Sequence, residues 1–293
     1  MTTSTRFNID TCAMLVEFNA SVWTARKLDR STSDEVVRDK GATAKDAARV
    51  NKNLLAGRGE LETVATLVGS VRQYVYENTL PWSDSGMRLL PSVKFSEFND
   101  RMGEYETQFV DIVNEFVGIY PTLITAQAMA LGDMFDRNEY PSAYDIAHKF
   151  SFRLNYMPVP TAGDFRVDVG NDAQDALRAQ LSKMADERIN NAMKDARDRL
   201  KTHLDRMMSQ LRVETVNGKV SKGKLYDTLI DGGLDLCNLL EALNLTGDQS
   251  IEDARRELKR LLDGADIVEL RKHDDARTDL REKVSEIMDK FAF

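Results

Sequence analysis

One stretch, residues 172–211, constrains the fold more than any other part of the sequence. Apolar residues recur along it in steps of four with an occasional step of three, which is the period of an α-helix. They are Leu177, Leu181, Ala185, Ile189, Ala192, Ala196, Leu200, Leu204, Met207 and Leu211. At 1.5 Å per residue such a helix is roughly 60 Å long, which exceeds the diameter of a compact domain. We therefore expect part of it to project or to pair with another helix.

Two interpretations of this long helix stay open. Its middle turns carry alanine at positions 185, 192 and 196, and small side chains allow a partner helix to approach closely. The opposite face mixes lysine, arginine and aspartate, which is typical of a solvated surface. The helix is either an antiparallel arm packed on its own chain, or an arm for self-association or for binding a protein partner.

The segment before the long helix has the period of two that is typical of β-strands. Its alternating apolar residues are Phe150, Phe152, Leu154 and Tyr156, then Phe165, Val167 and Val169 after a proline-rich bend. Pro158 and Pro160 cannot donate ladder hydrogen bonds, so the first strand must end there. The pattern predicts a small antiparallel hairpin, and helices must cover its apolar face because a lone hairpin is marginal in water.

Apolar periodicity predicts further helices on both sides of this stretch. Their ranges are 9–28, 60–76, 95–117, 121–134, 143–149, 224–245, 250–262 and 274–291. Gly232 and Gly233 are expected to kink or divide one of them. The Asn217-Gly218 pair indicates either a tight hairpin turn or a helix-ending cap.

The expected fold class is mainly α. A helical body occupies residues 1–149, and the hairpin and the long helix occupy residues 150–215. The C-terminal helices occupy residues 216–293, where they are free to pack back along the long helix.

The composition is that of a globular chain. Of 293 residues, 42% are hydrophobic and 30% are charged, and the formal net charge is −8. A surface this acidic is not expected to bind nucleic acid as a whole. The chain has no run of 18 apolar residues and no apolar segment behind its first residues, so we expect no membrane span and a cytoplasmic protein. Cys12 and Cys237 fit buried reduced thiols better than a disulfide.

Residues 24–58 are locally basic. Nine Lys or Arg residues stand there against five Asp or Glu residues, a balance of +4 in a chain of net charge −8. If the region is helical, Lys45, Arg49 and Lys52 share one face. This face is a candidate contact for a phosphate backbone or an acidic partner; the alternative is a solvated helix face, because no aromatic residues are interleaved for base stacking. The candidate contact residues are Arg26, Lys27, Lys45, Arg49 and Lys52.

A second candidate is the loop that Pro81 and Pro91 bracket. It holds Trp82, a turn and Arg88. A loop this apolar is usually pinned to the core by its Trp and Leu side chains. The alternative is an interaction loop in which Trp82 and Arg88 are exposed.

The sequence carries no signature of catalysis or metal binding. His148, His203 and His273 are not spaced at i, i+4 and do not lie near a cysteine pair, so no zinc site is expected. No Gly-rich phosphate loop or nucleophile elbow is present. Asp164 and Asp168 would lie about 13 Å apart on a strand, which favours a charged solvent face over a metal site. We therefore expect no enzyme, no cofactor, no metal and no small-molecule ligand.

Three local patterns resemble DUF3150, an uncharacterised family of proteobacteria and tailed phages. They are Trp23 with Ala25-Arg26-Lys27 and Asp29, the loop Leu80-Pro81-Trp82…Gly86-Met87-Arg88-Leu89-Leu90-Pro91, and Met157-Pro158…Gly163-Asp164-Phe165-Arg166-Val167 before the long helix. The resemblance extends to about Leu211 and supplies no catalytic residues. It implies a bacterial or phage protein. Members are associated with genes for MoxR-type ATPases and von Willebrand A-type proteins, which implies an accessory role in remodelling or assembly.

Three functions remain open at this point. The first is a non-catalytic intracellular interaction or assembly protein, accessory to an AAA+ ATPase system, whose partners are other proteins or copies of itself. The second is a nucleic-acid-associated phage protein, accessory to replication or recombination, that uses the basic helical face. The third is an enzyme of unrecognised type.

Overall fold

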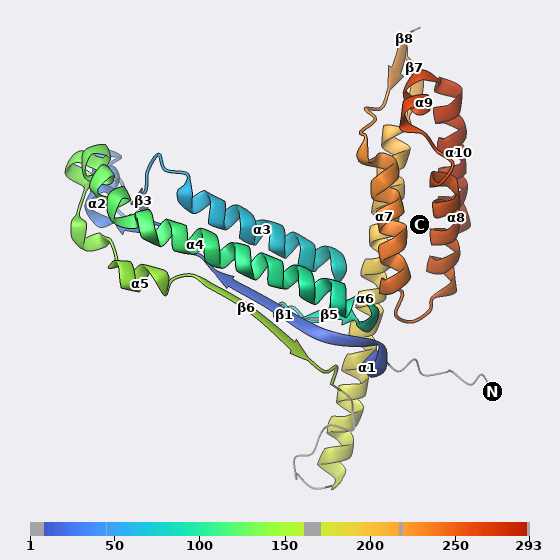
Figure 1. The fold of residues 1–293 in the computed structure, drawn as a ribbon, viewed down its shortest axis with the longest axis horizontal. Coiled ribbons are helices and arrows are strands. Elements are labelled where there is room, and N and C mark those ends of the chain that lie inside the picture. Colours follow the sequence, from blue (N-terminus) through green and yellow to red (C-terminus); the bar gives the residue numbers. More distant parts are fainter. Residues whose placement is uncertain (1–8, 45, 161–170, 217–218, 292–293) are drawn as a thin grey trace. The chain divides into compact units, whose positions relative to one another are not determined.

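The structure is a computed structural model that describes residues 9–44, 46–160, 171–216 and 219–291 (Figure 1). Of these residues 66% are helical, which confirms the mainly α fold. The chain forms two compact units, each described here by itself. Unit 1 comprises Met1–Glu17, Val75–Phe98 and Asn155–Phe293, and unit 2 comprises Phe18–Tyr74 and Asn99–Leu154. The units are interleaved along the chain, unlike the contiguous segments 1–149, 150–215 and 216–293 expected from the sequence.

Four strands form one sheet in the order β4-β5-β1-β6. Their bounds are Leu80–Pro81 for β4, Arg88–Pro91 for β5, Ala13–Ser21 for β1 and Ser151–Met157 for β6. β4 and β5 are an antiparallel hairpin that leads into the 3-10 turn η1 (Ser92–Lys94) and a long helix, α4 (Phe95–Leu131). β5 also pairs antiparallel with β1, with Leu89 opposite Leu15. Both of these leucines are buried, so the hairpin face contributes to the core of unit 1.

The predicted strand in residues 150–156 is confirmed as β6, and its sheet neighbour is β1. Its predicted partner strand, with Phe165, Val167 and Val169, lies outside the described residues, as do Asp164 and Asp168.

The prediction of a helix over residues 9–28 is wrong. Only α1 (Ile9–Cys12) is helical there, and the nine residues of β1 follow it. Leu15 and Val16 are adjacent in sequence and both buried, at 2% and 0% exposed. Two neighbouring side chains of a strand point to opposite faces, so a strand covered on both sides shows no clean alternation and imitates a helix pattern.

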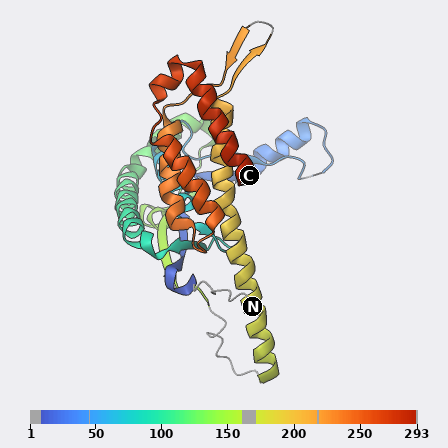
Figure 2. The ribbon, with the colours of Figure 1, turned by 90° about the vertical axis from the view of Figure 1, so that its right-hand side faces the viewer.

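Helix α6 (Asn171–Gln210) confirms the predicted long helix almost to the residue. Four further helices follow it in unit 1, and α7 and α10 pack along its C-terminal half (Figure 2). Their bounds are Thr228–Leu243 for α7, Gln249–Leu262 for α8, Ile267–Lys272 for α9 and Asp274–Lys290 for α10. Asp248 caps α8 by accepting hydrogen bonds from the backbone amides of Ser250 and Ile251. Helix α9 was not foreseen.

The core of unit 1 lies between these helices. Its fully buried side chains include Leu200, Leu204 and Met207 of α6, Leu240 of α7, Leu258 of α8 and Val284 of α10. Helix α7 runs unbroken through Gly232 and Gly233, so the expected division there is wrong. A Cβ at Gly233 would lie 2.7 Å from His203 Nε2, so this glycine lets α7 approach α6 closely. Between α6 and α7, β7 (Val213–Val216) and β8 (Lys219–Lys222) pair antiparallel. Asn217 and Gly218, for which the sequence indicated a turn or a helix cap, lie outside the described residues.

Unit 2 is built around residues 60–74 of α3 (Glu60–Asn78) and residues 99–131 of α4. Its core is aromatic: the Trp23 and Tyr120 rings meet edge to face at 5.7 Å, and the Phe116 and Phe150 rings at 5.5 Å. α4 is one helix with Pro121 inside it, not two helices that meet there. Pro121 cannot donate to the carbonyl of Val117, but the buried side chains of Leu123 and Ile124 hold the helix on the core beyond it.

The segment Ser92–Met134, which contains α4, is long and apolar enough to cross a membrane by length and composition. Core helices of soluble proteins pass the same test. Here Phe109, Phe116 and Tyr120 lie in the buried core of unit 2. α4 is thus the central helix of this unit.

The locally basic region forms a strand, a helix and a strand in unit 2. These are β2 (Arg26–Asp29), α2 (Arg30–Asp39) and β3 (Val50–Asn53), and β2 and β3 pair antiparallel. The expected helical face of Lys45, Arg49 and Lys52 is therefore wrong, since Lys52 lies on β3 and Arg49 directly precedes it. The remaining elements of unit 2 are the 3-10 turns η2 (Gly132–Met134) and η3 (Arg137–Glu139) and the short helix α5 (Ala143–Ala147).

Candidate functional site

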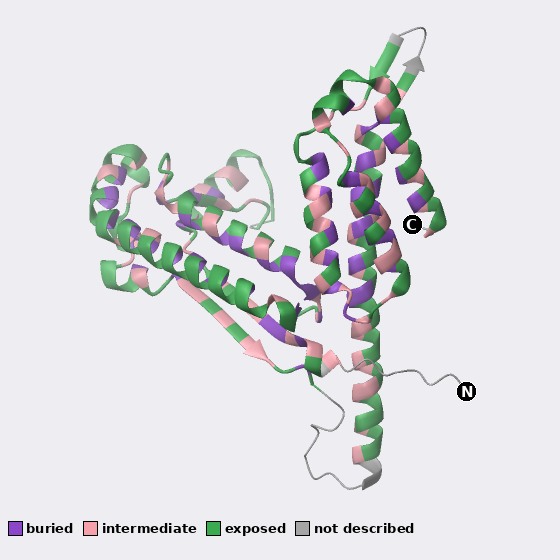
Figure 3. Ribbon diagram, turned by 45° about the vertical axis from the view of Figure 1, so that its right-hand side comes forward, coloured by how far each residue is buried: buried purple, intermediate pink, exposed green. Residues whose placement is uncertain are grey.

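The N-terminal part of α6 extends past the other helices of unit 1 (Figures 1 and 2). Residues 174–187, here called the α6 arm, contain no buried residue, and the first buried side chain of the helix is that of Ala192. Leu177, Leu181 and Met184 of the arm are half-buried, and none belongs to the core of unit 1 or packs against it. Figure 3 shows the change along the helix, from mainly exposed to mainly buried residues.

The spacing of these three side chains, four and then three residues, places them on one face of the arm. This is the pattern of an amphipathic helix that packs against another helix. None of the three side chains belongs to or packs against either core that the described residues form. The apolar stripe of the arm is thus the candidate contact surface.

Four of the five charged residues of the arm form two ion pairs. Arg178 lies 3.4 Å from Asp175, and Lys183 lies 3.8 Å from Glu187, all of them exposed. Exposed pairs of this kind contribute only about 0.3–0.5 kcal/mol each. With Asp186 the arm has a net charge of −1, so the stripe rather than the charge distinguishes this surface.

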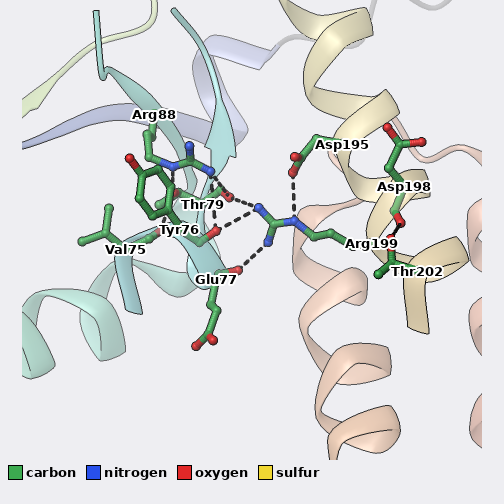
Figure 4. Close-up of polar contacts among 9 residues, drawn as sticks. All are labelled: Val75, Tyr76, Glu77, Thr79, Arg88, Asp195, Asp198, Arg199 and Thr202. Carbon is green, nitrogen blue, oxygen red and sulfur yellow. Dashed lines mark hydrogen bonds and ion pairs between the residues drawn. The ribbon is translucent and has the colours of Figure 1, made fainter. Parts of the chain in front are cut away.

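Beyond the arm, α6 is fastened to the C-terminal end of α3. The guanidinium of Arg199 donates hydrogen bonds to the backbone carbonyls of Tyr76, Glu77 and Thr79 at 2.8, 2.7 and 2.7 Å (Figure 4). Its Nε donates to Asp195, one turn earlier on α6, at 2.8 Å. The last carbonyls of a helix have no hydrogen-bond donor within the helix. At the end of α3, Arg199 of α6 supplies that donor.

A second arginine reaches the same group of carbonyls. Arg88 of β5 donates to the hydroxyl and the carbonyl of Thr79, and its guanidinium stacks 4.4 Å from the centre of the Tyr76 ring. Burial lowers the pKa of Arg88, and the neighbouring charge of Arg199 lowers it further. Two cations at a helix C-terminus are favourable because that end carries partial negative charge. We call Arg88, Arg199 and Asp195 the arginine clasp.

The loop residues Trp82 and Arg88 thus serve the fold of unit 1. Trp82 is 4% exposed and belongs to its core, and the guanidinium of Arg188 lies 5.4 Å from its ring centre. The pinned-loop interpretation therefore describes them better than an exposed interaction loop. Of the clasp, only the i, i+4 spacing of Asp195 and Arg199 is visible in the sequence.

The five candidate anion-contact residues have different environments. Arg26 and Lys27 are exposed on β2, and Arg49 is exposed before β3. Lys52 is 7% exposed. Its ammonium group lies 2.5 Å from the Glu139 carboxylate and donates a 2.6 Å hydrogen bond to the carbonyl of Met134, so Lys52 has a structural role inside unit 2. Lys45 lies outside the described residues.

The histidines, cysteines and acidic residues are the remaining candidates for catalysis or metal binding. No group of three His, Cys, Asp or Glu side chains in the described ranges is placed to hold a metal ion. His148 contacts the carbonyl of Tyr144, His273 lies beside Glu269, and His203 is buried in unit 1. Burial lowers the pKa of His203 to about 4 and raises the pKa of Cys237 to about 11, which leaves that thiol unreactive.

No protein-family model, curated protein or solved structure matches the chain. The resemblance to DUF3150 stays a prediction.

Proposed function

We propose that this chain is a non-catalytic interaction or assembly protein and that the α6 arm is its contact surface. The observation that carries the proposal is the half-buried stripe of Leu177, Leu181 and Met184, which precedes Ala192 and lies outside the core of unit 1. Full burial of a large apolar side chain stabilises a complex by about 1.5–3 kcal/mol relative to exposure to water. A partner that covers the stripe gains part of this free energy for each side chain that it buries. A partner that supplies an apolar groove, or another amphipathic helix, fits this surface.

The clasp supports the same function. It fastens α6 at Asp195 and Arg199, about two turns beyond the arm, to backbone carbonyls of a second element. A contact helix that is fixed at its base loses little conformational freedom on binding, which favours affinity. The resemblance to DUF3150 implies a bacterial or phage origin and an accessory role beside an AAA+ ATPase, and we include both in this proposal. The partner is therefore to be sought in a bacterial cell.

The test places a photo-crosslinking amino acid at Leu181 and, as the matched control, at Lys183 on a different face of the arm. Irradiation is carried out in extract from the native host and with the purified protein alone. We expect discrete crosslinked products from position 181, either to one host protein or to a second copy, and much weaker products from position 183. Equal products from both positions, or none from either, would count against a contact surface on the stripe.

A pair of substitutions separates loss of binding from loss of folding. Leu181→Asp lies on the arm, where no side chain is buried, and is expected to leave the melting temperature within a few degrees of the wild type. Leu200→Asp places a carboxylate at a side chain that is 0% exposed and is expected to unfold unit 1. Leu181→Asp should abolish the crosslinks formed from Leu177 while the protein remains folded.

A further inference from the structure

The β2–β3 ribbon of unit 2 has two different faces. Its register places Arg26 opposite Asn53, Lys27 opposite Lys52, Leu28 opposite Asn51 and Asp29 opposite Val50. Side chains alternate between the faces of a ribbon, so Arg26, Leu28, Asn51 and Asn53 share one face. Lys52 belongs to the other, which faces the interior of unit 2 through its contacts with Met134 and Glu139.

The outward face is polar and basic. Arg26, Asn51 and Asn53 are exposed on it, and Leu28 is half-buried between them. Two more exposed arginines flank the last register pair: Arg30 follows Asp29 and Arg49 precedes Val50. Arg26, Asn51 and Asn53 therefore lie within a ribbon of four residue pairs, roughly 13 Å long at 3.3 Å per residue. Arg30 and Arg49 lie directly beyond one end of it.

Carboxylates do not neutralise these arginines. Among the described basic residues of 24–58, only Lys52 forms an ion pair. The nearest acid in the ribbon, Asp29, is occupied as the N-cap of α2, where it accepts from the Thr32 amide and the Ser31 hydroxyl at 3.0 Å each. The hydrogen bond from Thr32 lowers the pKa of Asp29 most, so this carboxylate stays ionised in its cap. By contrast, Arg178 and Lys183 of the α6 arm each form an ion pair with an acidic residue of the arm.

The chemistry of this face fits a chain of phosphates. Arginine forks bind phosphate oxygens in pairs, and asparagine donates to phosphate or sugar oxygens. No aromatic residue stands on the face, so it offers no platform for the unstacked bases of a single strand. A duplex presents its phosphates at regular intervals without requiring base stacking.

We propose that the outward face of the β2–β3 ribbon binds the phosphate backbone of a nucleic-acid duplex, with Arg26, Arg30 and Arg49 as the charged contacts and Asn51 and Asn53 as hydrogen-bond donors. The binding is independent of base sequence, because every contact is to the backbone. The proposal does not depend on the function proposed for the α6 arm.

The experiment measures fluorescence anisotropy of a labelled 25-base-pair DNA duplex with the full-length protein at 50 and 200 mM NaCl. Three neutralised phosphates give a salt slope of about −2.7, which weakens binding roughly 40-fold between these concentrations. The variant Arg26→Gln/Arg49→Gln should bind at least tenfold more weakly at 50 mM NaCl and show a slope closer to −1. Both side chains are exposed, and an unchanged melting temperature confirms that the variant is folded.

The matched control removes two positive charges elsewhere. Arg178→Gln/Lys183→Gln on the α6 arm should change duplex affinity by less than twofold. The proposal is overturned if the wild type does not bind the duplex at 50 mM NaCl, or if the control weakens binding as much as the ribbon variant. Tighter binding to the single strand would refute the assignment to a duplex. If the protein binds polyglutamate but not the duplex, the face is a site for an acidic protein, and the proposal is refuted as well.

Discussion

Arg199 donates a 2.7 Å hydrogen bond to the backbone carbonyl of Thr79, a residue 120 positions earlier in the chain. Thr79 directly follows helix α3, and Arg199 lies two turns inside the packed half of α6. The bond therefore ties the end of α3 to the packed half of α6 within unit 1. This contact is the basis of the first prediction.

Arg199→Met should lower the free energy of unfolding of unit 1 by about 2–4 kcal/mol, because three backbone carbonyls lose their charged donor. Arg199→Lys should cost less but still be destabilising, since an ammonium group cannot reproduce the planar fork. Urea unfolding followed by Trp82 fluorescence in a Trp23→Phe background reports on unit 1. Lys194→Gln removes an exposed pair on the same helix and should stay within about 0.5 kcal/mol of the parent; a similar loss in this control would refute a specific role for Arg199.

The second prediction concerns pH and His203. Its pKa is about 4 in the folded protein, because burial and then the charge of Arg206 disfavour the cation. In the unfolded chain the pKa is about 6.5, so the unfolded state binds the proton first. Stability is thus fully present above pH 6.5 and falls as the pH drops toward 4, by roughly 3 kcal/mol in total.

The variant His203→Leu tests this dependence directly. It removes a buried imidazole whose Nε2 has no hydrogen-bond partner and should flatten the unfolding free energy of unit 1 between pH 4.5 and 7. His148→Gln, which changes an exposed histidine, should leave the wild-type profile in place. If the profiles of His203→Leu and the wild type run parallel, His203 is not the group that titrates.

Two adjacent glycines of α7 give the third prediction. A Cβ at Gly233 would contact the Leu262 side chain and lie 2.7 Å from His203 Nε2, whereas a Cβ at Gly232 would meet nothing within 4 Å. Gly233→Ala should destabilise unit 1 by about 1–3 kcal/mol through overpacking. Gly232→Ala should stabilise it by up to about 1 kcal/mol through helix propensity. Thermal unfolding of both variants measures the difference, and equal shifts would contradict the close approach of α6 and α7.

The fourth prediction uses the register partners Lys27 and Lys52. Lys52→Met leaves the half-buried Glu139 without its cation and should destabilise unit 2 by about 1–3 kcal/mol. Lys27→Met changes the exposed partner across the ribbon and should have little effect. Unfolding is followed through Trp23 fluorescence in a Trp82→Phe background. Comparable losses in the two variants would show that the ion pair with Glu139 is not what sets Lys52 apart from Lys27, its register partner on the same face.

Periodicity predicted α6 from the sequence because an unbroken apolar stripe at helical spacing has one interpretation over forty residues. The same rule failed in β1, where both faces are covered, so Leu15 and Val16 give no alternation. It also split α4 at Pro121, because the burial of Leu123 and Ile124 that holds the helix together is a tertiary effect.

The candidate sites were predictable in part. The basic composition of residues 24–58 was visible, but their arrangement was not, since the pairing of Arg26 with Asn53 joins strands that are far apart in the sequence. The i, i+4 spacing of Asp195 and Arg199 was also visible. The carbonyls that Arg199 binds belong to another element, and no local pattern indicates them.

The central claim is that α6 consists of a packed half and an uncovered arm, and hydrogen–deuterium exchange along this helix tests it most directly. Backbone amides of residues 177–187 should exchange at least a hundredfold faster than those of residues 196–207, because only the second group is held by burial in unit 1. Equal protection along the whole helix in the purified protein would contradict the account, since the arm would then be covered by the chain itself.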